Sequence, residues 1–418
     1  MTNIFSFDVK LGLRDIYWHI AVSLLVLPLL FSCGKEQESP STHPAVEEPK
    51  EAVLPELNIN LPQGHEINSK TVWVENATAS LVSENGNITE LGGAKIKGRG
   101  NSTWNYPKKP YALKLDKDAS LLGMPAGKRW DLLANYIDRT EIRNAVAFEV
   151  ANKTKSLEWT PKGRFVKLYI NMIYHGVYYL CEHIKIDKNR LNLHEGGYLL
   201  ELDVYYDEDF KFKSDSLGLP VQIKDWKGGE MTEERLSGIE KEFNEIESLI
   251  ISEDRATNGW QNLVDMDTFI DWWFAYELSE CGEPSGPKSS YMYRDKGGKL
   301  KAGPVWDFDW GTFRSGADVT HFRIKKAIFY KYLFQDPSFV KRVKEKWSES
   351  KSDFLSITGF IDEIAENVKG HVDRDKSKWP MTTTINYDES MSFEEAVATM
   401  KSNYKKHWEW MDKEINAF

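Results

Sequence analysis

VWDFDWGTF, residues 305–313, sets two acidic side chains among large aromatic ones. Asp307 and Asp309 alternate with these aromatic residues, and Gly311 follows directly. Carboxylates among apolar side chains cost free energy unless a cation or hydrogen-bond donors satisfy them. The stretch therefore predicts a pair of metal ligands, with the alternative that one aspartate is a structural helix cap.

A second informative stretch is KGRGNSTW, residues 97–104, which PKKPYALKL follows from residue 107 to residue 115. A basic, Gly-rich turn that carries hydroxyl groups and runs into a strand is suited to hold an anion. The alternative is that Asn101 and Ser102 only cap a turn, as such residues often do. Metal ligands in one stretch and phosphate donors in the other predict a site for metal-assisted phosphoryl transfer.

Composition limits the class of protein. The 418 residues are 41% hydrophobic and 28% charged, which is typical of a globular chain with a large core. The net charge of −10 argues against general nucleic-acid binding, so no nucleic-acid partner is expected. Aromatic residues make up 13% of the chain. Their helical spacing favours a ring-rich core over a stacking surface for sugars or bases.

The N-terminus carries features of a targeting signal. Lys10 and Arg14 precede an apolar run over residues 20–31, which is shorter than a bilayer-spanning helix needs. The run ends in Leu-Phe-Ser-Cys-Gly, which resembles a bacterial lipobox with cleavage before a lipid-bearing Cys33. We therefore expect a lipoprotein signal peptide over residues 1–33, with an uncleaved signal anchor as the alternative.

The expected mature chain starts with a tether. CGKEQE, residues 33–38, resembles the charged tag that directs lipoproteins of Bacteroidetes to the cell surface. Residues 34–55 are rich in Glu, Ser, Pro and Lys, which is typical of a flexible linker. The predicted location is the outer membrane or cell surface, with the membrane contacted through the lipid anchor.

Residues 56–418 are expected to form one α+β domain. Short strands separated by turns dominate up to about residue 202, and helical spacing dominates afterwards. Residues 289–305 read as a β-hairpin that leads into the WDFDW turn. Ser392 and Glu395 form a capping box before a long amphipathic helix. The pattern predicts a strand-rich N-terminal lobe and a helical C-terminal lobe.

Two cysteines, Cys181 and Cys281, remain in the expected domain. They can form one disulfide, but buried thiols are the expected state. No Cys/His cluster shows zinc spacing.

In four blocks the chain resembles the CotH kinase family, named for a spore coat protein. The similarity extends from about Leu57 to the C-terminus. It is carried by KGRGNSTW with PKKPYALKL, WDLLANYIDRTEIRNAVAFEVA at 130–151, LYINMIYHGVYYLCEHIKIDKNRL at 168–191, and KSSYMYRDKGGKLKAGPVWDFDWGTF at 288–313. The resemblance implies an atypical protein-kinase-like fold that uses ATP and Mg or Mn. It also implies phosphorylation of Ser or Thr in a protein substrate, here one of the cell envelope.

The resemblance suggests roles for individual residues. Lys114 is the expected phosphate lysine, and Glu182 is its expected ion-pair partner. The alternatives are that Lys114 points to solvent from an edge strand and that Glu182 is a surface charge beside Lys185. The remaining expected ligands are Arg99, Asn101, Ser102, Lys108 and Lys109 for the nucleotide, and Asp307 and Asp309 for the metal. Arg143 and Asn144 lie in a family block, but no step is assigned to them.

One turn departs from the family pattern. Many relatives carry Gly-Asn-Pro-Asp just before the Lys-Ser-x-Tyr segment, and the Asp there can serve as catalytic base. Here the turn reads CGEPSGPK, residues 281–288, with Glu283 and Ser285 where Asn and Asp are expected. Glu283 is the candidate replacement, and Asp307 is the second expected catalytic carboxylate. The alternative is a kinase-like fold with weak or no activity that binds a glycan or an envelope protein, or serves only as a structural component.

Overall fold

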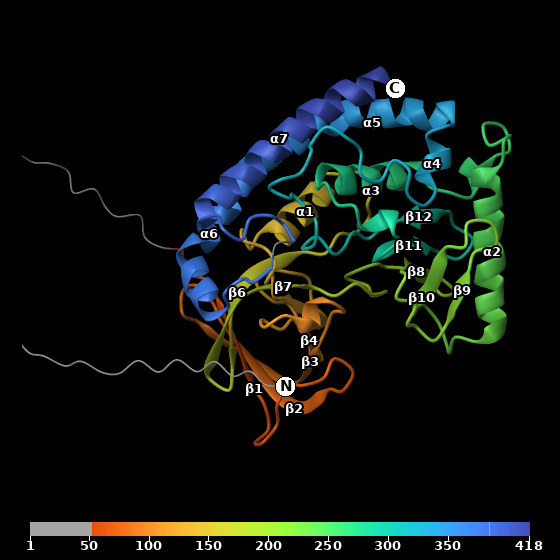
Figure 1. Ribbon diagram of the computed structural model, residues 1–418. Coiled ribbons are helices and arrows are strands. Elements are labelled where there is room, and N and C mark those ends of the chain that lie inside the picture. Colours follow the sequence, from red (N-terminus) through yellow and green to blue (C-terminus); the bar gives the residue numbers. More distant parts are fainter. Residues whose placement is uncertain (1–51, 384) are drawn as a thin grey trace, which may run out of the picture. The chain divides into compact units, whose positions relative to one another are not determined.

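Seven strands from the N-terminal half form a closed barrel in the computed structural model, which describes residues 52–383 and 385–418 (Figure 1). The barrel strands are β1 Glu56–Asn60, β2 Val74–Val82, β3 Ile88–Gly98, β4 Tyr111–Ala119, β5 Gly127–Leu133, β6 Gly163–Ile170 and β7 Ile173–Glu182. Their order around the barrel is β1-β2-β3-β4-β5-β7-β6. The ring closes because β1 pairs antiparallel with β2 and parallel with β6.

Alternation along the strands fills the barrel. Leu57 and Ile59 of β1 and Leu113 of β4 are buried in its interior core. The α+β prediction is confirmed, but the N-terminal lobe differs from the expected kinase-like one. Strand β1 joins both edges of the sheet, so all seven strands are paired into a barrel and no edge is left open.

A second sheet of five strands follows, in the order β12-β11-β8-β10-β9 (Figure 1). Its strands are β8 Tyr198–Leu202, β9 Lys211–Lys213, β10 Pro220–Trp226, β11 Ser290–Arg294 and β12 Leu300–Ala302. All neighbouring pairs are antiparallel. Strands β11 and β12 confirm the predicted hairpin. The lobe expected to be helical therefore also contains a sheet.

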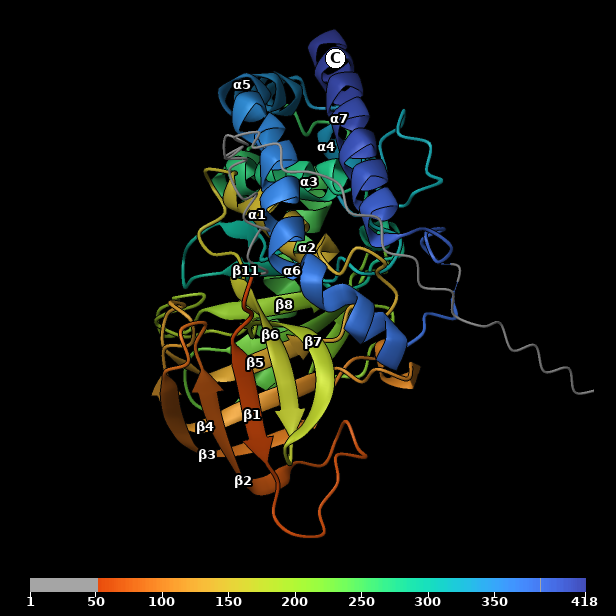
Figure 2. The same ribbon diagram turned by 90° about the vertical axis from the view of Figure 1, so that its left-hand side faces the viewer.

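Helices cover the second sheet and one side of the barrel. They are α1 Arg143–Asn152, α2 Glu233–Ile251, α3 Met266–Leu278, α4 Tyr330–Leu333, α5 Pro337–Leu355, α6 Ile357–Lys378 and α7 Phe393–Ala417, with 3₁₀ turns η1 Thr103–Asn105, η2 Trp260–Asn262 and η3 Glu283–Ser285. Helix α3 is central, because it contacts α1, α5, α7 and β12. Helix α6 lies against β7, where the barrel meets the helices (Figure 2).

Several local expectations are confirmed. The capping box of Ser392 and Glu395 starts α7, with both of its hydrogen bonds formed. Cys181 and Cys281 are buried thiols. The described residues belong to one compact unit, and none of their helices is long and apolar enough to cross a bilayer. The predicted lipidation site Cys33 lies outside the described residues. Residues 34–51 of the predicted tether also lie outside them.

Candidate functional site

A cleft of about 600 Å³ is lined by both the barrel and the second sheet. The barrel supplies the basic turn after β3 and the chain around Asp131 of β5. The other side comes from Glu201 of β8, the 283–289 segment and the WDFDW turn. The two stretches singled out in the sequence therefore face one another across a single cavity.

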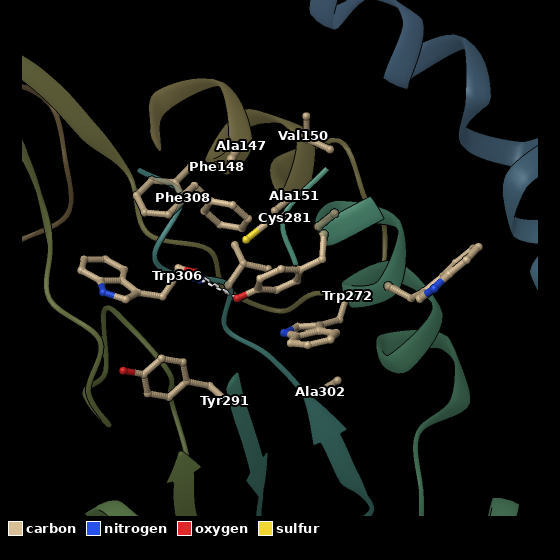
Figure 3. Packing of buried hydrophobic residues seen from close by; sticks show 14 of the residues in the cluster. Ala147, Phe148, Val150, Ala151, Trp272, Cys281, Tyr291, Ala302, Trp306 and Phe308 are labelled. Carbon is tan, nitrogen blue, oxygen red and sulfur yellow. Dashed lines mark hydrogen bonds between the residues drawn. The ribbon is translucent and has the colours of Figure 1, made fainter. Parts of the chain in front are cut away.

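The WDFDW turn is held from behind by buried side chains. The Tyr276 hydroxyl of α3 lies 3.2 Å from the backbone nitrogen of Trp306 and donates to its carbonyl oxygen at 3.0 Å. The ring of Phe148 in α1 stacks on Trp306 and meets Phe308 edge-on, as Figure 3 shows. Trp306 and Phe308 are thus anchored by buried rings, and Asp307 and Asp309, which alternate with them, lie at the cleft.

Two asparagines fix the backbone of the same turn. Asn144 of α1 accepts a hydrogen bond from the Phe308 amide at 3.1 Å. Asn386 accepts one from the Gly311 amide at 3.0 Å and donates to the Asp309 carbonyl at 2.9 Å. Asn144 lies in a family block without an assigned role, and the structure gives it a positioning one.

The two aspartates of the turn carry raised pKa values. Burial raises the pKa of Asp307, and the positive charge of Arg99 opposes that rise. Burial and then the negative charge of Asp307 raise the pKa of Asp309 to about 8. Two carboxylates that repel each other in a partly desolvated site favour the arrival of a cation.

The donor set suits a hard divalent cation. Asp307 and Asp309 offer carboxylate oxygens, the ligands that Mg²⁺ and Mn²⁺ take in proteins. Within residues 52–383 and 385–418, no three His, Cys, Asp or Glu side chains gather as a ready-made metal site. The protein thus provides two carboxylates at the cleft, and Mg²⁺ is commonly bound by one or two carboxylates together with phosphate oxygens and water.

The basic turn brings Arg99 to the barrel side of the cleft, opposite the WDFDW turn. Its guanidinium lies over the ring of Trp306 at 5.2 Å, and its Nε is 3.3 Å from Asp131 Oδ1. The other oxygen of Asp131 is 2.8 Å from His183 Nδ1. Burial alone would raise the pKa of Asp131, but the charges of Arg99 and His183 outweigh burial and lower it. Arg99 is thus oriented in the cleft by an ionised partner.

The geometry of this turn requires both of its glycines. A Cβ on Gly98 would collide with the ring of Trp104. Gly100 has a φ of +83°, and a Cβ there would meet Thr103. Both glycines keep the turn tight, and the expected ligands Asn101 and Ser102 are exposed at the cleft.

The second sheet adds a group that sequence reasoning missed. Tyr291 stands opposite Glu201 in the ladder of β8 and β11, and its hydroxyl donates to Glu201 Oε1 at 2.7 Å. Lys224 Nζ of β10 lies 2.8 Å from Glu201 Oε2 and 2.8 Å from Glu208 Oε1. A Lys–Glu pair therefore does line the cleft, but it is Lys224 with Glu201. The sequence signal is clear only in β8, YLLEL, where Glu201 is a single charged residue among apolar and aromatic ones.

The unusual 282–287 turn places Glu283 in the cleft. Its side chain is mostly buried, and Lys288 Nζ lies 3.5 Å from its carboxylate. Burial and then the charge of Asp307 raise the pKa of Glu283 to about 7, against the opposing charge of Lys288. Ser285 does not line the cleft, because its hydroxyl donates to the Arg323 carbonyl at 3.0 Å. Glu283 is thus the residue of this turn that faces the site.

The expected pair of Lys114 and Glu182 is wrong. Paired residues on neighbouring strands point to the same side of a sheet. Glu182 pairs with Trp130, whose side chain points into the barrel. Lys114 pairs with Arg129 and therefore points to the outside of the barrel. Glu182 is fully buried and pairs with Arg190, so the alternative partner Lys185 is also wrong. Lys114 lies outside the cleft.

Lys108 and Lys109 also have other partners. The Lys108 ammonium is fully buried, 2.8 Å from Asp375 and 3.6 Å from Glu141. Lys109 donates to the Trp104 carbonyl at 2.7 Å and does not line the cleft. Lys108 is among the residues that line the cleft, but its ammonium pairs with Asp375 and Glu141, so this arrangement does not support the expected phosphate contact. Lys109 is engaged in the basic turn itself.

Comparison with models of protein families gives a match over residues 96–417 to the family described as CotH kinase protein. The matched range contains the basic turn, the Glu283 turn and the WDFDW turn, but it begins near the end of β3. A search of curated proteins finds no match.

Proposed function

The chain belongs to the CotH kinase protein family, and from this premise and the cleft geometry we propose that it binds ATP with a divalent cation and transfers phosphate to a protein hydroxyl. The observation that supports this most is the meeting of Asp307, Asp309, Arg99 and Glu283 in one cleft. Phosphoryl transfer needs positive charge on the phosphates, carboxylates for the cation and a base for the acceptor. These residues are of the right chemical types.

In this proposal each residue has one task. Arg99 binds phosphate oxygens, and Asp131 keeps its guanidinium in place. Asp307 and Asp309 hold the cation, which when bound neutralises charge on the phosphates. Asn144 and Asn386 keep the turn of these aspartates rigid.

Glu283 is the proposed general base. A pKa of about 7 lets it accept a proton from the acceptor Ser or Thr hydroxyl near neutral pH. The positive charge of Lys288, beside Glu283, stabilises the ionised form of this glutamate. The glutamate thus takes the role that the resemblance assigns to an aspartate of this turn.

The proposed acceptor is a protein of the cell envelope, and the proposed location is the outer membrane or cell surface. Both rest on the lipobox-like sequence around Cys33, outside the described residues. Metabolic labelling with a fatty acid tests the anchor. Wild type is expected to take up label and Cys33→Ala is not, and equal labelling of both contradicts the anchor.

Calorimetric titration with ATP, with and without Mg²⁺ or Mn²⁺, tests the nucleotide site. Asp307→Asn is expected to abolish metal-dependent binding while leaving the melting temperature within about 2 °C, because a repulsive pair loses one charge. Asp318→Asn, at an exposed aspartate outside the cleft, is the matched control. Unchanged Mg-ATP binding by Asp307→Asn would show that the metal assignment is wrong.

A second candidate function is glycan binding without transfer. It is favoured by two exposed aromatic rings at the cleft, Tyr205 and Trp310, which are 50% and 47% exposed. Binding of envelope polysaccharide that is lost in Trp310→Ala, in a chain that does not bind ATP, would favour this function over the first.

A further inference from the structure

A row of three cations crosses the outer face of the barrel beside the cleft. Lys95 of β3 stands opposite Lys114 of β4, and Lys114 stands opposite Arg129 of β5. Neighbouring strands lie about 4.8 Å apart, so this cationic row spans about 10 Å. Its last member, Arg129, also lines the cleft.

The row is costly for the fold. Like charges directly opposite one another destabilise a sheet. Lys95 has a carboxylate partner in Glu75 at 2.9 Å, but in the described part of the chain neither Lys114 nor Arg129 forms an ion pair. Burial, then the charges of Lys95 and Arg129, lower the pKa of Lys114. The buried Nε of Arg129 also lacks a hydrogen-bond partner among the described atoms.

An aromatic ring supports the cationic row. Lys95, Lys97 and Arg129 lie over Trp73 at 5.5, 5.0 and 4.9 Å from the ring centroid. Cation–π contacts hold positive charge in place without neutralising it. The charges are therefore concentrated and oriented, although the whole chain carries a net charge of −10.

A second cavity of about 580 Å³ lies along the row. Six cations and three aspartates line this cavity. Lys185, Arg190 and Lys224 each have a carboxylate partner. Lys114, Lys128 and Arg129 are the other three cations. Of these aspartates, Asp225 already accepts the Ile186 amide at 2.7 Å. The cavity shares Arg129, His183, Ile184 and Lys224 with the cleft, so the two are neighbours.

We propose that the cationic row docks an acidic segment of the protein substrate, on one side of the residue that receives phosphate. This inference rests on the proposed function and names its substrate class. An extended peptide rises about 3.3 Å per residue, so acidic side chains a few residues apart match the row. The cleft carries Asp307, Asp309 and Glu283, which repel an acidic segment. The acidic residues therefore flank the acceptor only towards the barrel.

Fluorescence anisotropy tests docking without nucleotide. The probe is a labelled peptide of one Ser followed by a run of Glu, titrated with the full-length chain at low and at 0.15 M salt. An isosteric Ser-Gln peptide is the control ligand. The Glu peptide is expected to bind more tightly than the Gln peptide, and salt is expected to weaken only the Glu peptide.

The variant for this test is Lys95→Gln with Lys114→Gln, whose side chains lie outside the cleft. It is expected to bind the Glu peptide about fivefold more weakly, since each exposed ion pair contributes up to about 1 kcal/mol. Lys341→Gln with Lys405→Gln, on exposed faces of α5 and α7, is the matched control and is expected to bind as wild type does. Equal binding by both double variants, or equal binding of the two peptides, would overturn the proposal.

Two further measurements separate the explanations. Row-dependent binding of phosphatidylglycerol vesicles, without binding of the Glu peptide, would overturn the proposal in favour of a membrane surface. Phosphate transfer to both peptides at equal efficiency would overturn the docking site but leave the transferase. Row-dependent peptide binding without any transfer would leave the docking site and remove the proposed activity.

Discussion

At the scale of single residues, Glu283 carries the chemistry that is most specific to this chain. Its carboxylate is buried beside Asp307, and its pKa is raised to about 7. Above this pH the group is ionised and can accept a proton. Below this pH it is protonated and cannot act as a base.

We therefore predict that transfer by wild type rises with pH through about 7. Glu283→Gln should lower the rate about a hundredfold and remove this rise, because an amide accepts no proton. Phosphate incorporation into a Ser-rich protein from pH 5.5 to 8.5 is the measurement. Ser285→Ala in the same turn is the control, since its hydroxyl is turned to the Arg323 carbonyl. Transfer that is unaffected by Glu283→Gln would place the base elsewhere.

At the scale of elements, the WDFDW turn depends on segments far away in the chain. Asn386, from the segment before α7, joins three backbone groups: the Gly311 amide and the carbonyls of Asp309 and Ile137. Because it is 1% exposed, water does not replace these bonds when the side chain is removed. The position of Asp309 is thus set partly by the C-terminal segment.

Asn386→Ala is predicted to lower the free energy of unfolding by about 1–3 kcal/mol, because buried backbone groups lose their partners. Mg-ATP affinity should fall as well, since the carbonyl of Asp309 is released. Thermal denaturation and calorimetric titration measure the two effects. Asn416→Ala, at an exposed position of α7, should change neither. Unchanged Mg-ATP affinity in Asn386→Ala would show that the turn keeps its geometry without this contact.

At the scale of the whole molecule, several buried carboxyl groups make stability depend on pH. Burial is the main cause that raises the pKa of Glu141, Glu277 and Glu280 to about 7, as it does for Glu283. Asp309 is raised to about 8. The folded chain therefore keeps protons that the unfolded chain releases near pH 4, so stability is lost as pH rises from about 4 to about 8.

A divalent cation should reverse part of this loss. It binds the folded chain with Asp307 and Asp309 ionised, so the rise in melting temperature on adding Mg²⁺ or Mn²⁺ should be larger at pH 8 than at pH 6. Differential scanning calorimetry at both values measures it. In Asp307→Asn the melting temperature should no longer rise on adding metal. It should still fall with rising pH, because the buried glutamates remain. An equal metal effect in wild type and Asp307→Asn would contradict the site.

The sequence by itself determined the local structure and the chemical types at the cleft. The hairpin of β11 and β12, the capping box of α7 and the alternating strands follow from side-chain period and turn chemistry, which act over a few residues. Asp307 and Asp309 were identifiable because charges inside an aromatic run need a partner.

Only the tertiary structure decided which residues meet. Barrel closure joins β1 to β6, more than a hundred residues away, and no local pattern specifies that pair. Lys114 and Glu182 were paired wrongly from their order in the chain, because they lie on opposite sides of the barrel wall. The cleft recruits Glu201 and Lys224 because their strands are neighbours in the second sheet. Partner choice depends on strand order and on which side of the sheet a residue occupies, and both are set only when the sheets assemble.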